Sequence, residues 1–417
     1  MKQKLKEYKG ITLIALIITI IVLLILAVVA ISTVKGDGII AHAKNAKKTY
    51  SEAQTNEKST MQGYLDRLEE SQLKSIKIKD NLNKVLSTGG NITLEDDFGN
   101  KIKVPAGFKI LVDSTTGYTA DDINVTKGIV VEDGEGNQFV WIPVGTIYAD
   151  IEKTEANAKT ITLGRYKDFT KTNNVYTVAQ NASDYEIQVK IRDSHAARTE
   201  DTTSNHNSDY KNSIAKNIGE FCTKSLANGG YYIGRYEARV ENYDASNINT
   251  SNSGNSTDWT GYVAESGKQL KLASKANSQV WNYVTQNKAS SLCQSMYTNK
   301  PFESDLINGY AWDTAIIFFQ EFGDNSTYAS KTSVNDTLVN TGTSGTSYTG
   351  TKDVICNVYD MASNCWEWST ENHINSKIPC IIRGGYCGGP LAYTSCYNSN
   401  YTTSTNVCYS FRPVLYM

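Results

Sequence analysis

Cysteine and histidine are the residues of this sequence that could bind a transition metal or act as nucleophiles. The four histidines are widely spaced, which leaves little material for a histidine-built metal centre or catalytic triad. The eight cysteines all lie in the distal half without a CxxC pair, so their spacing does not fit a zinc ribbon. In an oxidising compartment some of them would pair, in a connectivity that the sequence leaves open. They are Cys222, Cys293, Cys356, Cys365, Cys380, Cys387, Cys396 and Cys408.

The charged residues give no sign of a nucleic-acid partner. The formal net charge is −2, and the Lys and Arg residues are scattered and form no basic patch. Polar uncharged residues dominate the chain after position 85, and the whole sequence contains 26 Tyr and 6 Pro. This composition is typical of secreted binding surfaces and β-rich folds, so we expect no nucleic-acid binding.

The length of 417 residues predicts an anchor, a stalk and one large domain or two fused small ones. Residues 35–85 are rich in Ala, Lys, Glu and Gln without Pro, which predicts a helical stalk. Residues 86–138 alternate apolar and polar side chains around Asp-Gly and Gly-Asn turns, which predicts β-hairpins leading into the main domain. The main domain is then expected over 139–417.

The main domain shows a mixture of helix and strand signals, which predicts an α+β fold. FVWIPVG at 139–145 and GGYYIGRYEARV at 229–240 are expected strands. Helices are expected over Thr285–Tyr297 and over Ser304–Phe322, with Gly323 as the stop. A further helix is expected before 229, because a set of apolar residues shares one helical face: Ile214, Ile218, Phe221, Cys222 and Leu226.

An uncharged apolar segment at residues 11–34 is long enough to cross a hydrocarbon core of roughly 30 Å. Lys2, Lys4, Lys6 and Lys9 precede it, so the positive-inside tendency places the N-terminus in the cytoplasm and the remainder outside. We therefore expect a single-pass cell-membrane protein with an extracellular C-terminal domain.

The residues around Gly10 indicate how this segment is processed. A short basic leader, 1–10, ends in Gly10 directly before the apolar run. This arrangement resembles the type IV pilins, and the resemblance implies cleavage between Gly10 and Ile11 by a prepilin peptidase. The family's usual Glu at the fifth mature position is Ala15 here, which puts filament assembly in doubt. An uncleaved signal anchor is the alternative.

Three motifs occur in order near the C-terminus: DMASNCWEWST at 360–370, IIRGGY at 381–386 and SFRPVLY at 410–416. Together with the strands at 139 and 229, they resemble the formylglycine-generating, sulfatase-modifying family. The resemblance implies a variant of the C-type lectin fold over 139–417, following the transmembrane and stalk helix. A shared fold does not imply shared chemistry, so the sites of that family are compared one by one.

Enzymes of that family use a pair of cysteines after the RGG motif to bind copper and activate oxygen. The matching positions here are Gly389 and Thr394, neither of which is cysteine. Cys387 and Cys396 lie nearby at a different spacing, and no histidine cluster offers the iron site of the ergothioneine-type relatives. We therefore expect no enzymatic activity.

The same resemblance implies a structural calcium ion. Asp360 and Glu367 would supply side-chain oxygens, and Ser363 and Cys365 would supply backbone carbonyls. The alternative is that Glu367 only caps buried backbone groups. Arg383 and Arg412 lie in the signature motifs, and we expect both to be buried and to fix the C-terminal strands through internal hydrogen bonds.

Residues 386–410, between the RGG and FRP motifs, contain no charge and are rich in Tyr, Ser, Thr and Asn. This composition is typical of antibody binding loops, in which Tyr provides a stiff contact surface and small polar residues provide adaptable hydrogen bonds. The segment resembles the variable region of proteins diversified by retroelements; a loop that simply packs on the domain is the alternative. The predicted contact residues are Tyr386, Tyr393, Tyr397, Asn398, Asn400, Tyr401, Thr403 and Asn406.

Three functions follow from these patterns. The leading hypothesis is a membrane-anchored recognition protein that binds a protein or glycan through residues 386–410. The first alternative is a minor pilin with a globular head. The second is a copper- or iron-dependent oxidase of the formylglycine-generating family.

Overall fold

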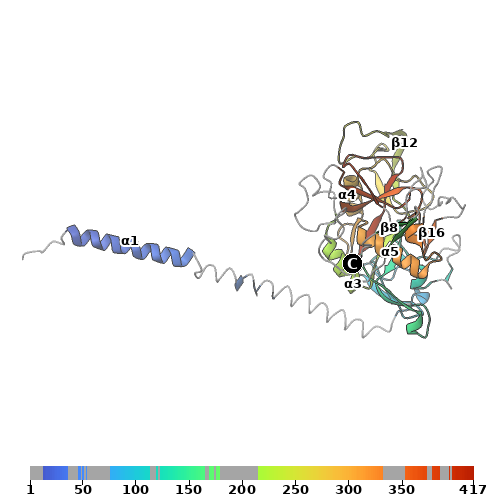
Figure 1. Cartoon of the computed structure of the whole chain (residues 1–417), viewed down its shortest axis with the longest axis horizontal. Coiled ribbons are helices and arrows are strands. Elements are labelled where there is room, and N and C mark those ends of the chain that lie inside the picture. Colours follow the sequence, from blue (N-terminus) through green and yellow to red (C-terminus); the bar gives the residue numbers. More distant parts are fainter. Residues whose placement is uncertain are drawn as a thin grey trace, which may run out of the picture. The chain divides into compact units, whose positions relative to one another are not determined.

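The computed structural model divides the chain into two compact units, residues 1–75 and residues 76–417 (Figure 1). We call the second unit the head. The residues that the structure describes are 13–35, 46–47, 49–50, 53, 76–112, 119–120, 123–164, 169–172, 175–178, 215–331, 353–372, 378–385, 394 and 397–417.

The first unit contains the helix α1, Leu13–Lys35, which covers most of the predicted membrane segment. Its side chains are described from Leu16 to Val29, and every large apolar one among them is between 47% and 64% exposed. Among the helices within the described ranges, none meets the length and apolarity that crossing a membrane requires.

A six-stranded antiparallel sheet forms one half of the head, in the order β15-β22-β10-β5-β4-β3. The expected strand at 139–145 is confirmed as β5, whereas GGYYIGRYEARV is divided between β10 and β11, Arg239–Glu241. Strands from the region 86–138 and strands from beyond residue 139 are neighbours in this sheet. The six strands are β3 Lys109–Ile110, β4 Val130–Glu132, β5 Gln138–Pro143, β10 Gly230–Gly234, β15 Glu303–Leu306 and β22 Pro413–Tyr416.

A four-stranded sheet in the order β20-β19-β18-β21 contains parts of the three C-terminal motifs; the last of them continues into β22 of the six-stranded sheet. Strand β21 runs parallel to β18, and the other neighbours are antiparallel. Arg412 lies between β21 and β22, so the chain passes from this sheet to the six-stranded sheet at that residue. The strands are β18 Trp366–Asn372, β19 Cys380–Arg383, β20 Tyr397–Asn400 and β21 Tyr409–Phe411.

Three α-helices of the head begin at polar N-cap residues, whose side chains accept a hydrogen bond from the first turn. The helices are α3 Ile218–Ala227, α4 Gln286–Met296 and α5 Gly309–Phe322, capped by Asn217, Thr285 and Asn308 respectively. The prediction of a helix from Ser304 was wrong, because Glu303–Leu306 pairs with β22 and the helix begins only at Gly309, after its cap Asn308. The expected face of α3 is confirmed for Ile218, Phe221 and Cys222, but Leu226 is 38% exposed.

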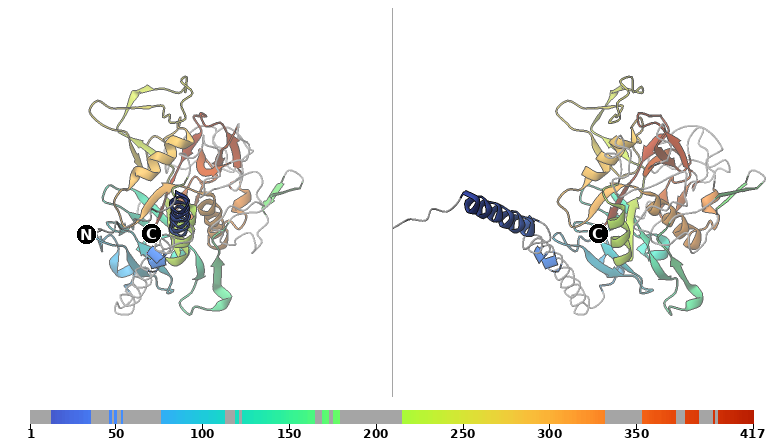
Figure 2. Two further views of the ribbon diagram at one scale, coloured as in Figure 1. Left: turned by 90° about the vertical axis from the view of Figure 1, so that its left-hand side faces the viewer. Right: turned by 60° about the vertical axis from the view of Figure 1, so that its left-hand side comes forward.

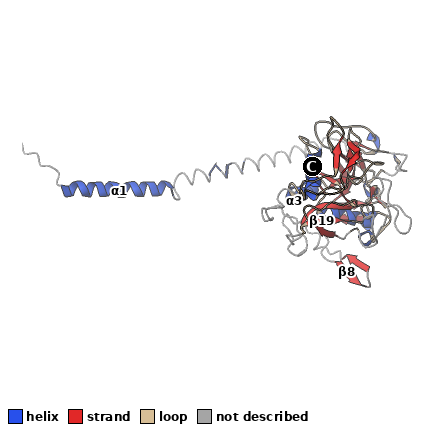
Figure 3. Cartoon of the chain, turned by 90° about the horizontal axis from the view of Figure 1, so that it is seen from above, coloured by secondary structure: helices blue, strands red, loops and turns tan. Residues whose placement is uncertain are grey.

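The remaining described strands form two-stranded ribbons, one of which contains β8, labelled in Figure 3. Of the predicted stalk, residues 76–85 belong to the head and contain one 3-10 turn, η1. The ribbons pair β1 Ile92–Glu95 with β2 Lys101–Val104, β6 Gly145–Tyr148 with β7 Ala158–Ile161, β8 Phe169–Thr172 with β9 Val175–Val178, β11 with β14 Lys271–Ala273, β12 Tyr243–Ile248 with β13 Tyr262–Ala264, and β16 Val354–Ile355 with β17 Val358–Tyr359. The 3-10 turns are η1 Lys79–Asn81, η4 Val125–Lys127, η5 Glu155–Asn157 and η8 Tyr328–Ser330.

Two apolar clusters fill the head. The larger contains Trp141 and Tyr231 of the six-stranded sheet together with Phe221 of α3 and Trp312 of α5. The smaller contains residues of α4 and of the four-stranded sheet, including Trp368 and Phe411. All described buried apolar residues lie at position 78 or beyond, so the head has its own core and is expected to fold by itself.

Candidate recognition site and its buried frame

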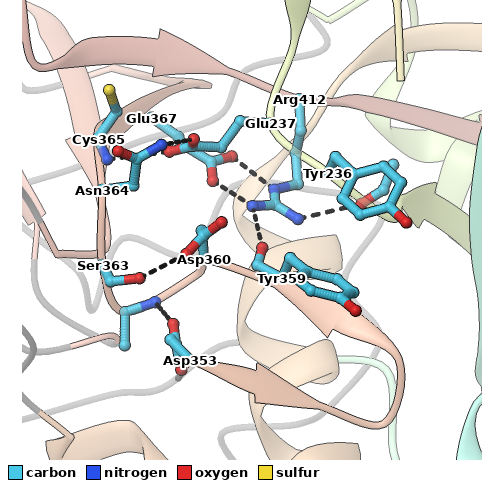
Figure 4. A network of polar contacts seen from close by, with 12 residues as sticks. Tyr236, Glu237, Asp353, Tyr359, Asp360, Ser363, Asn364, Cys365, Glu367 and Arg412 are labelled. Carbon is cyan, nitrogen blue, oxygen red and sulfur yellow. Dashed lines mark hydrogen bonds and ion pairs between the residues drawn. The ribbon is translucent and has the colours of Figure 1, made fainter. Parts of the chain in front are cut away.

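Arg412 is fully buried at the passage between the two sheets, as predicted, and every hydrogen bond it makes ties elements together (Figure 4). Its Nε donates to Glu367 Oε2 at 2.6 Å, and its Nη2 donates to Glu367 Oε1. Nη1 donates to the carbonyl of Gly234 at 3.0 Å, and Nη2 also donates to the carbonyl of Tyr359 at 2.9 Å. The guanidinium therefore fixes β18, β10 and β17 around one buried charge.

The segment Asp360–Cys365 is held by carboxylates from other elements. Glu237 accepts from the backbone N–H of Cys365 at 2.9 Å and from the side-chain amide of Asn364. Asp353 accepts from the backbone N–H of Ala362 at 2.6 Å. Asp360 and Asn364 both have positive φ, at 61° and 60°, in the left-handed region that Asp and Asn adopt more readily than most other non-glycine residues.

The electrostatics of this cluster follow from its burial. Burial raises the pKa of Glu237 well above its ordinary value, and the neighbouring charges of Asp360 and Glu367 add to that effect. Burial also raises the pKa of Glu367, although Arg412 opposes the shift. The direct hydrogen-bond partners of Glu237 are two N–H donors without a formal charge.

The residues predicted to bind calcium lie together on this segment. Both carboxylate oxygens of Glu367 accept from Arg412, and Asp360 Oδ1 accepts from the hydroxyl of Ser363 at 2.8 Å. Within the described part of the chain, no group of three or more His, Cys, Asp or Glu side chains is placed to hold a metal ion. In this arrangement Glu367 does not fit the predicted calcium shell, because its charge is already paired; calcium binding stays a prediction.

Arg383, the arginine of the RGG motif, forms a second buried ion-pair group, as predicted. It pairs with Asp313 of α5 and, through Nε, with Glu371 Oε2 of β18 at 3.1 Å. The two glycines that follow it lie against the backbone of the Asp360–Cys365 segment. A Cβ on Gly384 would lie 2.5 Å from the carbonyl oxygen of Met361, and one on Gly385 would lie 1.9 Å from that of Ala362. Glycine is therefore required for this close approach.

Thr394, one of the two positions compared with the cysteine pair in the sequence analysis, is buried. The backbone N–H of Thr394 donates to the carbonyl of Lys331 at 3.1 Å, and its own carbonyl accepts from Trp312 Nε1 at 2.9 Å. Gly389, Cys387 and Cys396 lie outside the described residues. Thr394 is thus fixed to Lys331 and to Trp312 of α5 by its backbone.

The described cysteines of the head occur both in a disulfide and as free thiols. Cys408 is disulfide-bonded, whereas the other five described cysteines are free thiols. Burial raises the pKa of Cys356 and of Cys380 to about 12, so neither is a thiolate at neutral pH. The free thiols are Cys222, Cys293, Cys356, Cys365 and Cys380.

The predicted contact residues fall into three groups. Tyr386 and Tyr393 lie outside the described residues, as do Gly10 and Ile11 of the predicted cleavage site. The backbones of Tyr397 and Asn398 belong to β20, opposite Arg383 and Ile382. The others are described in full: Asn400, Tyr401, Thr403 and Asn406.

Residues 400–407, which we call the C-terminal loop, follow β20 and present side chains to solvent. Tyr401 is 59% exposed, and Asn406 is exposed as well. Asn400 is half-buried; its Oδ1 accepts from the hydroxyl of Tyr409 at 3.3 Å, while its Nδ2 has no hydrogen-bond partner among the described residues. The Tyr409 ring stacks on Trp366, with centroids 6.0 Å apart. The loop thus exposes the ring of Tyr401 and the side chain of Asn406, whereas the amide nitrogen of Asn400 is buried.

Two parts of this arrangement were not predicted. Glu237 supports the Asp360–Cys365 segment from a distant position and Asp353 supports it from nine residues before Ala362, and no local pattern marks either of them. A neighbouring loop, residues 249–257, contacts the C-terminal loop through Asn252, whose Nδ2 donates to the carbonyl of Thr403 at 3.0 Å. The absence of charge between Ala245 and Thr257 is a sequence signal that could have identified this second loop.

In comparisons with known proteins, no protein-family model and no curated protein matches the chain. The chemistry of the site therefore has to be argued from its own residues. Rigid buried groups hold an uncharged, partly aromatic loop at the surface, which suits binding through hydrogen bonds and ring contacts.

Proposed function

We propose that this chain is a membrane-anchored recognition protein of the cell surface, whose head binds a ligand through the segment between Arg383 and Arg412. The head is proposed to be a formylglycine-generating-enzyme-like variant of the C-type lectin fold without the catalytic cysteines. The observation that carries the proposal is the contrast within this region. Both arginines are completely buried in ion pairs, while the chain between them contains no charged residue and exposes Tyr401.

This contrast is useful for binding because a fixed frame lowers the entropy that a loop loses when it meets its ligand. Ordering one flexible side chain at an interface costs about 0.5–1.5 kcal/mol. Here the C-terminal loop is tied to the domain on both sides: Tyr283 donates its backbone N–H to the carbonyl of Asn406 at 3.1 Å, and Asn252 bonds to Thr403. A tyrosine ring held on such a loop gives contact area at small entropic cost.

The location is proposed from the N-terminal residues and one cysteine. Residues 11–34 carry no charge, and the described apolar side chains of α1 are exposed within the unit, so they need an apolar partner such as a bilayer. A prepilin peptidase would release the leader 1–10. The disulfide at Cys408 favours an oxidising, extracytoplasmic compartment. N-terminal sequencing of the mature protein is expected to begin at Ile11; an N-terminus at Met1 would contradict the processing.

A cell-binding assay tests the function. The purified head, residues 76–417, would be labelled and offered to a panel of intact bacteria and phage particles, with binding read by flow cytometry. We expect specific binding to some members of the panel, lost when Tyr401 is replaced by alanine. Absence of binding across the panel, or equal binding by the Tyr401→Ala head, would overturn the proposal.

A further inference from the structure

A second uncharged loop lies beside the C-terminal loop. No charged residue occurs from Ala245 to Thr257, a stretch that includes most of β12 and the connection towards β13. Figure 2 shows this ribbon, in yellow-green, projecting from the head in both views. We call residues 249–257 the projecting loop.

Asn252 joins the two loops. Its Nδ2 donates to the carbonyl of Thr403 in the C-terminal loop at 3.0 Å and to the carbonyl of Ser256 at 2.8 Å, while its Oδ1 accepts from the backbone N–H of Ser256 at 3.0 Å. One amide therefore closes the projecting loop and fixes it to its neighbour. The side chains of Ser251, Ser253 and Asn255 are left exposed around this contact.

The surface that results is neutral and rich in hydrogen-bonding groups. The nearest charge along the projecting loop is Asp258, which is paired with Lys288 at 3.6 Å. The exposed side chains of both loops are hydroxyls and amides, together with the ring of Tyr401 at 59% exposure and Val407 at 39%.

We propose that the projecting loop and the C-terminal loop form one binding surface and that its ligand is an uncharged glycan. This inference rests on the proposed recognition function and specifies its ligand. A protein partner would have to present an uncharged patch, because charged side chains buried against this surface would be left unpaired at a considerable cost. A neutral sugar brings only hydroxyls, which pair with amides and hydroxyls, and apolar C–H faces, which pack on an aromatic ring.

A glycan array tests this assignment with the purified head. The array carries neutral gluco-, manno- and galacto-oligosaccharides beside sialylated, sulfated and uronate-containing ones, and a parallel array carries surface proteins. We expect binding to neutral glycans, with an affinity that changes less than about twofold between about 0.05 and 0.5 M salt, because no charge pair is screened. Binding to anionic glycans alone, or to proteins alone, would overturn the glycan assignment and leave the recognition function standing. Binding to nothing on either array would contradict both.

Charge insertion tests whether the projecting loop belongs to the surface. Ser253→Asp places a carboxylate on the exposed loop, and Ser326→Asp places one on an exposed serine outside both loops. We expect the first to weaken binding to the neutral glycan at least about tenfold, because the carboxylate must be desolvated, and the second to change it less than about twofold. Thermal unfolding of both variants is expected to match the original head. Equal affinity of the Ser253→Asp head would exclude the projecting loop from the site.

Discussion

Replacing Arg412 with methionine tests whether the buried frame holds the head together. The change keeps most of the side-chain volume but removes the charge that faces Glu367 and the donors to the carbonyls of Gly234 and Tyr359. Breaking a buried ion pair by removing one partner costs roughly 3–5 kcal/mol. In a domain of this size each kcal/mol lowers Tm by about 2 °C, so the expected fall in Tm is roughly 6–10 °C.

Differential scanning calorimetry of the purified head measures this difference, with Arg239→Met as the matched control. Arg239 is half-buried, donates to the carbonyl of Ala276 at 3.2 Å and lies 3.6 Å from Glu241, so its loss is expected to cost at most about 1 kcal/mol. A further expected result is that the difference in Tm between Arg412→Met and the original head becomes smaller at acidic pH, because protonated Glu367 no longer needs a counter-charge. If Arg412→Met unfolds at the same temperature as Arg239→Met, the account of the frame is wrong.

The other predictions concern the same frame and its surroundings. Gly385→Ala is expected to lower the free energy of unfolding by at least about 2 kcal/mol in denaturant titration, because its Cβ would lie 1.9 Å from the carbonyl oxygen of Ala362. An unchanged denaturant midpoint would show that the backbone at 385 lies further from this oxygen. Burial raises the pKa of Asp305 from 3.8 to about 6, so the stability that its protonated form contributes is present below pH 3.8 and is lost as the pH rises through 6. Asp305→Asn is therefore expected to reduce the fall in Tm between these pH values. An unchanged dependence of Tm on pH in the variant would contradict this assignment. Because Glu367 is paired with Arg412, any calcium ion held by this cluster is expected to bind weakly, so EDTA is expected to change Tm by no more than about 1 °C. A fall in Tm of several degrees would show that calcium binds tightly and takes a place in the cluster.

The sequence predicted those parts of the head whose signals are local. A continuous apolar run correctly located β5, and apolar residues on one helical face correctly located α4. The motifs around Arg383 and Arg412 correctly indicated buried, paired guanidinium groups. The start of α5 was predicted too early because the residues just before Asn308 carry no strong helix-breaking signal. Pairing of Glu303–Leu306 with β22, far along the chain, decides that this segment is a strand.

The rest depends on contacts between residues that are distant in sequence. Glu237 and Asn364 meet across 127 positions, and Asn252 and Thr403 across 151. Neither contact leaves a local pattern, because a single Glu or Asn on a half-polar segment is common on any surface. The Glu367 carboxylate could be predicted to bind calcium, but its partner Arg412 becomes apparent only when β18 and β21 are seen side by side.

The affinity of the Tyr401→Ala head for a cell or glycan that the original head binds is the most direct test of the recognition function. Ile151→Ala is the matched control, because Ile151 is also highly exposed, at 69%, and lies in the turn between β6 and β7. With all three proteins unfolding at the same temperature, we expect Tyr401→Ala to weaken binding at least about tenfold and Ile151→Ala to change it less than about twofold. Equal affinities of the original head and the Tyr401→Ala head would contradict the proposed site.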